Sequence, residues 1–195
     1  MRLYFAPASP YSRKVRTAAI ELGIANQIEV VLQMPRDNSK GFFDINPLAR
    51  IPVLETDEGE VLYDSPVICE YLNAQAGGSL FPANGWQRWH ALKRQAVGDG
   101  ILDSAVPLRQ EMLRPAAQQS EEFIARNRAT VARALRVLEY AKQGPVDIGS
   151  LAIGCALGYL DYRFTDWDWR RDYPALAAWY GTLTARPSFI QTLPI

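Results

Sequence analysis

The sequence predicts two parts of different fold classes: an α/β part built on a four-stranded mixed sheet, and then an all-α part. Short apolar or alternating runs typical of strands occur only in the first 63 residues, whereas apolar residues recur at helical spacing after residue 85. Between these parts lies a stretch rich in Gly, Pro, Ser and Asn. We therefore expect an α/β domain over residues 1–76, a linker over 77–85 and a helical domain over 86–195.

The first half of the α/β part is predicted to be a strand–helix–strand unit. Residues 3–5 are a short apolar run that suits a buried strand, and Ser9-Pro10 is a helix start, with a capping hydroxyl before a proline at the first helical position. Residues 28–32 alternate between apolar and polar, as a strand does. Because a helix joins the two strands, they must run parallel.

The second half of the α/β part is predicted to be a hairpin followed by a helix. The polar stretch over residues 33–44 is interpreted as a loop. Residues 52–56 and 61–63 flank the turn sequence Asp-Glu-Gly-Glu, which is typical of an antiparallel hairpin. Ser65 precedes Pro66 and repeats the pattern of a helix start.

The all-α part contains four stretches with helical periodicity. The first covers about residues 86–112 and the fourth about 173–184. The second begins at residues 120–122 and has Val131, Leu135 and Leu138 on one face, and the third is capped at residues 147–150 and runs through Leu157. A short turn is expected at 187–189. Pro107 is expected to kink or end the first of these helices. The third stretch is apolar on most sides, which predicts a helix at the centre of a bundle.

Composition and charge exclude several classes of function. The chain has 195 residues with 21 Lys and Arg against 21 Asp and Glu, so it lacks the basic excess of a protein that binds nucleic acid. It contains no apolar run long enough to cross a membrane and no recognisable signal peptide, so we expect a cytoplasmic protein with no membrane partner. Two cysteines, Cys69 and Cys155, and the single His90 predict neither a disulfide framework nor a metal site.

The first candidate for chemistry is the pair Ser9 and Ser12 at the start of the first helix. A dithiol oxidoreductase would place a Cys-x-x-Cys pair here, so two serines exclude thiol–disulfide exchange at this position. A serine hydroxyl can instead donate a hydrogen bond to a bound thiolate. With the helix N-terminus, such a bond lowers a thiol pKa of about 8.5 by roughly 1–3 units. The alternative is that Ser9 serves only as a helix cap.

Two further segments have the right groups for binding a peptide-like ligand. The helix start at Ser65 offers a hydroxyl and free backbone amides to a carboxylate, and Asp64 beside it can pair with an ammonium group. Both residues also suit a plain helix cap. A cis bond between Ile51 and Pro52 would turn the Ile51 backbone towards such a ligand, although the statistics of X-Pro bonds favour the trans isomer.

These motifs resemble those of soluble glutathione transferases. Residues 9–16 (SPYSRKVR), 46–54 (NPLARIPVL) and 64–68 (DSPVI) occur in the order and spacing of that family, and an all-α half follows them. Residues 98–103, 114–121 and 155–163 are similar to one bacterial group within it. The resemblance implies a thioredoxin-like first domain, glutathione as the co-substrate, no metal, and a homodimer.

The resemblance also implies a role for individual residues. Ser9 matches the serine that stabilises the thiolate, Ser12 is the second candidate, and Tyr4 is a weaker third. The glutathione-binding residues implied are Arg50, Ile51, Pro52, Asp64 and Ser65: the Ile51 backbone pairs with the cysteinyl unit before a cis Pro52, and Asp64 with Ser65 holds the γ-glutamyl group.

The second substrate is expected to be a small, apolar electrophile, and Tyr11, Leu102, Tyr159 and Trp167 are candidates for contacting it. The activity implied is conjugation of glutathione, as in detoxification, or reduction of peroxides by the same thiolate. The alternative is a non-catalytic protein of the same fold with a regulatory or partner-binding role. One departure from the family concerns the helix cap at residues 147–150, where Asp-x-x-Ser replaces Ser/Thr-x-x-Asp and predicts a weaker reciprocal bond.

Overall fold

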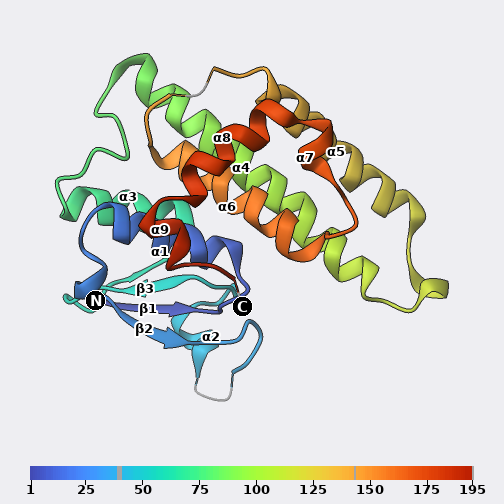
Figure 1. The fold of residues 1–195 in the computed structure, drawn as a ribbon. Helices are drawn as coiled ribbons and strands as arrows, with labels where there is room; N and C mark the ends of the chain where they lie inside the picture. The colour runs from blue at the N-terminus through green and yellow to red at the C-terminus, as the bar shows by residue number, and fades with distance from the viewer. Residues whose placement is uncertain (39–40, 143, 195) are drawn as a thin grey trace. The chain divides into compact units, whose positions relative to one another are not determined.

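A computed structural model of the chain describes residues 1–38, 41–142 and 144–194 (Figure 1). The chain forms two compact units. The first contains Met1–Trp89 together with Pro187–Ile195, and the second contains His90–Arg186. The domain ranges expected from the sequence stay a prediction.

The sheet of the first unit has the predicted four strands and mixed topology. It contains β1 (Arg2–Phe5), β2 (Glu29–Leu32), β3 (Val53–Glu55) and β4 (Val61–Leu62), in the order β2-β1-β3-β4. β1 pairs with β2 in parallel, and the remaining neighbours are antiparallel. The thioredoxin-like arrangement expected from the resemblance is therefore confirmed.

Helices cover both faces of this sheet. Figure 1 shows α1 (Pro10–Glu21) and α3 (Ser65–Gln75) on one face, and the short α2 (Phe42–Ile45) on the other; a 3-10 turn, η1, spans Ala25–Gln27. α2 lies partly within residues 33–44, which were expected to be a loop. It forms because Phe42 packs into a buried apolar cluster with Ala6, Ile51 and Val53.

The segment after residue 186 returns to the first unit and packs on α1. Residues expected to form a turn begin α9 (Pro187–Ile190). The Arg13 guanidinium donates to the Phe189 carbonyl oxygen at 3.2 Å and lies 5.3 Å from the centre of the Phe189 ring. The Thr17 and Thr192 hydroxyl oxygens are 3.1 Å apart. Arg13, Thr17 and Thr192 are all buried, so this contact is part of the core of the first unit.

The described part of the second unit is helical. α4 (Gly85–Met112) begins in the first unit and continues into the second, where it is followed by η2 (Ala116–Gln118), α5 (Glu121–Glu139), α6 (Ile148–Arg163), α7 (Trp169–Asp172) and α8 (Pro174–Thr184). Each α6 residue from 148 to 160 is buried, as expected of a central helix. No helix in the described residues has the length and apolar character needed to span a membrane.

Pro107 does not end α4, so of the two outcomes expected at this residue the helix end is wrong and the kink stays a prediction. The helix continues through it to Met112. A proline removes one backbone hydrogen bond, but Ala105 and Leu108 on either side of it are fully buried. Burial of this apolar face offsets the missing bond.

The start of α6 has a complete capping box. The Asp147 carboxylate accepts from the Ser150 amide at 3.0 Å, and the Asp147 amide donates to the Ser150 hydroxyl at 3.2 Å. The reciprocal bond is therefore present, and its expected weakness relative to Ser/Thr-x-x-Asp stays a prediction. Arg94 adds an ion pair to the Asp147 carboxylate.

Two glycines let α4 and α6 approach closely (Figure 1). A Cβ atom on Gly98 would lie 2.5 Å from the Ala152 carbonyl carbon, and one on Gly149 would lie 2.7 Å from the Ala91 carbonyl oxygen. Residue numbers rise together along the two helices, so α4 and α6 run parallel at this contact.

Candidate functional site

The topology of the sheet brings the three predicted ligand-binding segments to one edge. The register pairs Tyr4 with Val53 and Leu54 with Leu62. The end of β1, the start of β3 and the end of β4 therefore lie at the same edge. Ser9 follows β1, the Ile51–Pro52 bond precedes β3, and Asp64 follows β4.

Ser9 is the N-cap of α1, and its geometry leaves one proton available. Its Oγ accepts from the Ser12 amide at 3.1 Å, so the hydroxyl hydrogen can be donated to another group. Ser12 is 1% exposed, and its Oγ has no hydrogen-bond partner among the described residues. Ser9 is half-buried and thus more accessible than Ser12.

Tyr4, the third candidate, points its hydroxyl to a protein partner. The Tyr4 hydroxyl donates to the Glu55 carboxylate at 3.1 Å, and its ring packs against Phe42 with ring centres 5.9 Å apart. Both contacts are with residues of the sheet or of the apolar cluster that contains Phe42, so they give Tyr4 a structural role.

The loop before β3 is shaped by Asn46, whose role the sequence analysis did not assign. The Asn46 side chain donates to the Arg50 carbonyl oxygen at 2.8 Å and accepts from the Leu48 amide at 3.0 Å. The Arg50 side chain is exposed, while Ile51 is buried. The Ile51–Pro52 peptide bond is cis, as the resemblance implied and against the isomer favoured by X-Pro statistics. The Asn-Pro dipeptide at residue 46 was a turn signal that could have identified this loop.

The start of α3 has polar groups that the protein leaves unsatisfied. Asp64 is exposed and makes no capping hydrogen bond to the described backbone. Ser65 is 1% exposed, yet its Oγ has no hydrogen-bond partner in the described part of the chain. Buried hydroxyls are nearly always hydrogen-bonded, so an unpartnered one is a candidate for contacting a ligand.

Positive charge accompanies Ser9 along α1. Arg16 lies over the Phe5 ring, with its guanidinium carbon 5.1 Å from the ring centre. Partial burial, and then the nearby charge of Arg13, lowers the pKa of the Arg16 guanidinium from its ordinary value. An anion near the start of α1 would benefit from both this charge and the helix dipole.

The candidates for the second substrate lie in both units. Tyr11 is half-buried in the first turn of α1. Leu102 on α4 is fully buried and belongs to the hydrophobic core. Tyr159 on α6 is 6% exposed. Trp167 is half-buried in the segment after α6.

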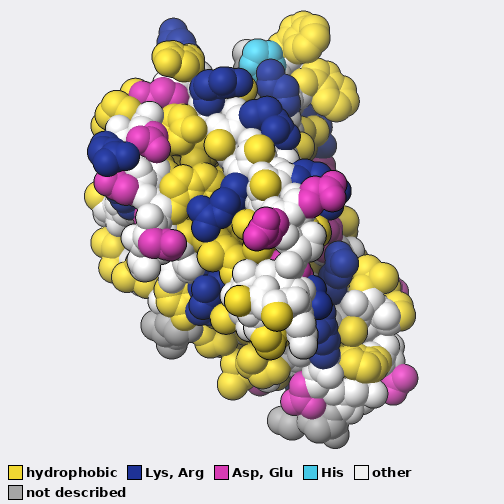
Figure 2. All heavy atoms as spheres, turned by 90° about the vertical axis from the view of Figure 1, so that its right-hand side faces the viewer, with side chains coloured by type: hydrophobic (Ala, Val, Ile, Leu, Met, Phe, Trp, Pro, Cys, Tyr) yellow, Lys and Arg dark blue, Asp and Glu magenta, His cyan; other side chains and the backbone are white. Residues whose placement is uncertain are grey.

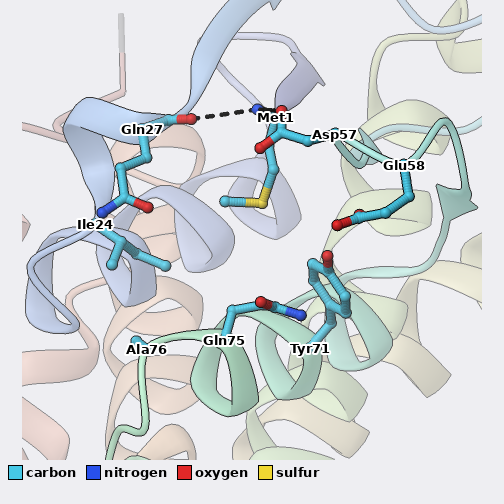
Figure 3. Close-up of a pocket in the computed structure, with 8 residues that line it drawn as sticks. All are labelled: Met1, Ile24, Gln27, Asp57, Glu58, Tyr71, Gln75 and Ala76. Atoms are coloured by element: carbon cyan, nitrogen blue, oxygen red, sulfur yellow. Dashed lines mark hydrogen bonds and ion pairs between the residues drawn. The ribbon is translucent and has the colours of Figure 1, made fainter.

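A hollow of about 340 Å³ lies at the opposite edge of the sheet and holds none of these residues (Figure 3). It is lined by Met1, Ile24, Gln27, Asp57, Glu58, Tyr71, Gln75 and Ala76. Burial, and then the charges of Glu58 and Asp57, raises the pKa of the Tyr71 hydroxyl. The hollow is thus polar and acidic, which does not suit a thiolate or a carboxylate.

Within the described residues, no three His, Cys, Asp or Glu side chains are grouped closely enough to hold a metal ion. On the face drawn in Figure 2, basic and acidic side chains of the described residues are interspersed with hydrophobic ones. Neither sign of charge dominates that face.

Comparison with known proteins identifies the family. The sequence profile of the glutathione S-transferase N-terminal domain matches residues 8–75, and that of the C-terminal domain matches residues 121–182. The chain is 35% identical to the uncharacterized GST-like protein YibF of Escherichia coli K12, over 100% of this chain and 98% of that protein. The chain belongs to the glutathione S-transferase family.

Solved structures of this family show what similar chains bind. A glutathione transferase family member from Pseudomonas fluorescens Pf-5, solved with bound glutathione, is 39% identical with a TM-score of 0.92, over 100% of this chain and 98% of that one. The same protein was also solved with S-(propanoic acid)-glutathione. A glutathione S-transferase from Methylobacillus flagellatus, with glutathione bound, is 36% identical with a TM-score of 0.92, over 100% of this chain and 99% of that one.

Proposed function

We propose that this chain is a glutathione transferase in which Ser9 stabilises the glutathione thiolate. The observation that carries the proposal is the Ser9 hydroxyl, which accepts from the Ser12 amide and keeps its own proton for donation. A hydrogen bond to a thiolate contributes roughly 1.5–3 kcal/mol and a helix N-terminus roughly 0.3–1 kcal/mol. Together these terms lower the thiol pKa by about 1–3 units, so the bound thiol is largely ionised at neutral pH.

The remaining segments at the same edge of the sheet fit the rest of glutathione. Ser65 offers its unpartnered hydroxyl and the first amides of α3 to the γ-glutamyl carboxylate, while the exposed Asp64 pairs with the ammonium group. The Ile51 backbone before the cis Pro52 pairs with the cysteinyl unit, and the exposed Arg50 pairs with the glycyl carboxylate. Similar chains that bind glutathione support this assignment.

The reaction is a nucleophilic attack by the thiolate. The glutathione thiol gives its proton to solvent, a bond forms between sulfur and an electrophilic carbon, and a leaving group departs or the resulting carbanion takes a proton. Tyr11, Leu102 and Tyr159 are proposed to border the second substrate. A cytoplasmic homodimer with a role in detoxification also stays a prediction, and light scattering of the purified chain tests the dimer.

The first test is binding of glutathione to the whole chain. We expect a rise in melting temperature at millimolar glutathione, together with the ultraviolet absorbance of an ionised thiol. Absence of any binding would refute the proposal. Binding without an ionised thiol would favour a regulatory or partner-binding protein, and turnover of a hydroperoxide without conjugation would favour peroxidase activity.

The second test separates catalysis from helix capping. Ser9→Ala removes an N-cap, which costs about 1 kcal/mol of stability, and also removes the thiolate donor. The matched control is Ser120→Ala, because Ser120 caps α5 by accepting from the Phe123 amide at 3.2 Å. We expect a similar loss of stability from both, but a thiol pKa raised by about 1–2 units only in Ser9→Ala. If Ser12→Ala raises the pKa instead, the assignment to Ser9 is wrong.

A further inference from the structure

Arg13 on α1 is a buried cation whose partners are neutral. The residue is 4% exposed. Its guanidinium donates to the Phe189 carbonyl oxygen at 3.2 Å and to the Thr192 hydroxyl at 3.5 Å, and it lies over the Phe189 ring. Within the described residues, the Arg13 side chain makes no ion pair with a carboxylate. Buried charges are rare unless they are paired, so this arginine calls for an explanation.

Two other arginines of the first unit have carboxylate partners. Arg2 pairs with Glu29 at 3.2 Å and with Glu55 at 3.3 Å. Arg88 pairs with Glu70 at 2.5 Å. Both of these arginines are more exposed than the buried arginine of α1, although their charges are already cancelled. The charge that costs most to bury is therefore the one that the described residues leave uncancelled.

The segment that holds Arg13 contacts one face of α1 over two helical turns (Figure 1). Arg13, Thr17 and Glu21 are spaced by four residues and so share that face. The Thr17 and Thr192 hydroxyl oxygens are 3.1 Å apart, and the Ser188 hydroxyl donates to the Glu21 carboxylate at 2.5 Å. The acidic residue of α1 is thus bonded to a neutral group two turns away from the arginine, and does not cancel its charge.

The other surroundings of α1 add little negative charge. The elements packed against it are α3, η1 and α9, and neither η1 nor α9 contains a charged side chain. The whole of residues 187–194 is uncharged as well. The charged side chain of α3, Glu70, pairs with Arg88. Within α1 the neighbouring charges, Lys14 and Arg16, are also positive, so positive charge dominates the first half of this helix.

Arg13 lies one helical turn from the residue proposed to hold the thiolate. Its backbone amide donates to the Ser9 carbonyl oxygen at 2.9 Å. Four residues of helix rise about 6 Å, and helix side chains lean towards the N-terminus. A thiolate that accepts from the Ser9 hydroxyl therefore lies about 10 Å from the guanidinium. At an effective dielectric constant of about 20, a positive charge at that distance lowers a thiol pKa by about one unit.

We propose that Arg13 supplies a permanent positive charge that stabilises the glutathione thiolate at Ser9, and that residues 187–192 preserve this charge by holding it with neutral groups. This inference rests on the proposed function, because the thiolate is the anion that it concerns. A guanidinium stays charged at any working pH, and an anion at the start of α1 offsets the cost of burying it. The C-terminal segment is then a part of the glutathione site that touches no ligand.

A pair of matched ligands tests the proposal by calorimetry at pH 8. Glutathione ionises at sulfur, whereas the sulfur of S-methylglutathione cannot. We expect Arg13→Gln to weaken binding of glutathione about three- to tenfold and to leave binding of S-methylglutathione within about twofold. Equal weakening of both ligands would mean that Arg13 only supports the shape of the site, and would overturn the proposal. The control is Arg2→Gln, which removes a charge already cancelled by two carboxylates and should change neither affinity.

A second pair of variants keeps Arg13 and changes the charge of its surroundings. Thr192→Asp places a carboxylate beside the guanidinium, whereas Thr192→Asn introduces a neutral side chain of the same size. We expect the aspartate to raise the pKa of the bound thiol by about half a unit to one unit, and the asparagine to leave it within about 0.2 units. The ultraviolet absorbance of the thiolate against pH measures both, and equal values in the two variants would overturn the proposal even if Arg13→Gln does not fold.

The same titration of wild-type protein separates this proposal from the proposed function. If wild type does not bind glutathione, or binds it without an ionised thiol, the proposed function fails and this inference fails with it. If wild type ionises the bound thiol and Thr192→Asp leaves its pKa unchanged, this inference alone is refuted, and the assignment of the thiolate to Ser9 stands.

Discussion

Two helices of this protein begin with the same residue types and use them in opposite ways. At the start of α6 in the second unit, Asp147 and Ser150 bond to each other's backbone amides, and Asp147 also pairs with Arg94. At the start of α3 in the first unit, Asp64 is exposed and Ser65 is buried without a partner among the described residues. Aspartate and serine stabilise the fold in one place, and in the other they are the groups that we propose bind the γ-glutamyl end of glutathione.

The largest effect is expected from a substitution at the start of α6, where the side chains of Asp147 and Ser150 are hydrogen-bonded. Asp147→Ala removes a cap and leaves the partly buried Arg94 without its carboxylate, so we expect a loss of about 3 kcal/mol in the free energy of unfolding. Asp64→Ala should change stability by less than about 0.5 kcal/mol. Urea denaturation of both variants measures the contrast, and equal losses would show that the two helix starts are alike.

The next effect tests how tightly the start of α6 is packed. A Cβ atom on Gly149 would lie 2.4 Å from Arg94 Cβ, so Gly149→Ala should cost about 2 kcal/mol through overpacking. Gly100→Ala on α4 is the control, because a Cβ atom there meets nothing within 4 Å. We expect this control to gain up to about 1 kcal/mol from helix propensity. A neutral Gly149→Ala would mean that α6 shifts freely.

A smaller effect is expected from removing the serine hydroxyl at each helix start, Ser65 of α3 and Ser150 of α6. Ser65→Ala should weaken glutathione binding about tenfold, or about 1.4 kcal/mol, without lowering the melting temperature, since the Ser65 hydroxyl bonds to no described group. Ser150→Ala should lower stability by about 1 kcal/mol and leave glutathione affinity unchanged. Calorimetric titration and thermal melting of both variants report the two quantities. A Ser65→Ala variant that loses stability but not glutathione affinity, or a Ser150→Ala variant that loses affinity but not stability, would contradict the roles assigned to these two helix starts.

The smallest effect is at the other end of α6, where burial raises the pKa of the Tyr159 hydroxyl above its ordinary value of 10.0. A raised tyrosine pKa contributes stability below pH 10 that is lost as the pH rises through the folded-state pKa. We expect the ultraviolet titration of wild type to show a phenol ionising above pH 10 that Tyr159→Phe lacks. Identical titrations would mean that the Tyr159 hydroxyl ionises as an ordinary exposed phenol does.

The sheet was predictable from the sequence because its signals are local. Strand alternation, the hairpin turn over residues 57–60 and the Ser-Pro helix starts each arise within a few residues, and the structure confirms the four-stranded mixed sheet. The helix end expected at Pro107 was wrong for the opposite reason. The cost of the proline is local, but the burial of Ala105 and Leu108 that offsets it depends on distant parts of the chain.

The candidate site was predictable in its segments but not in its atoms. Cap statistics alone describe Ser9 and Ser65 equally well as helix caps. Only the structure shows that Ser9 accepts a capping bond, whereas the Ser65 hydroxyl has no described partner. Similarly, X-Pro statistics favour a trans Ile51–Pro52 bond, and the resemblance to a family implied the cis isomer that is present.

The contact between α1 and the segment after residue 186 determines when the first unit can finish folding during synthesis. Arg13 reaches Phe189 and Thr192, which are 176 and 179 residues further along the chain. A ribosome therefore makes all of the second unit before the last part of the first unit exists. Contacts of such long sequence separation form late and fold slowly, because the loop between them must close first. The helix that Ser9 caps acquires its complete surroundings only after residues 187–192 have been made.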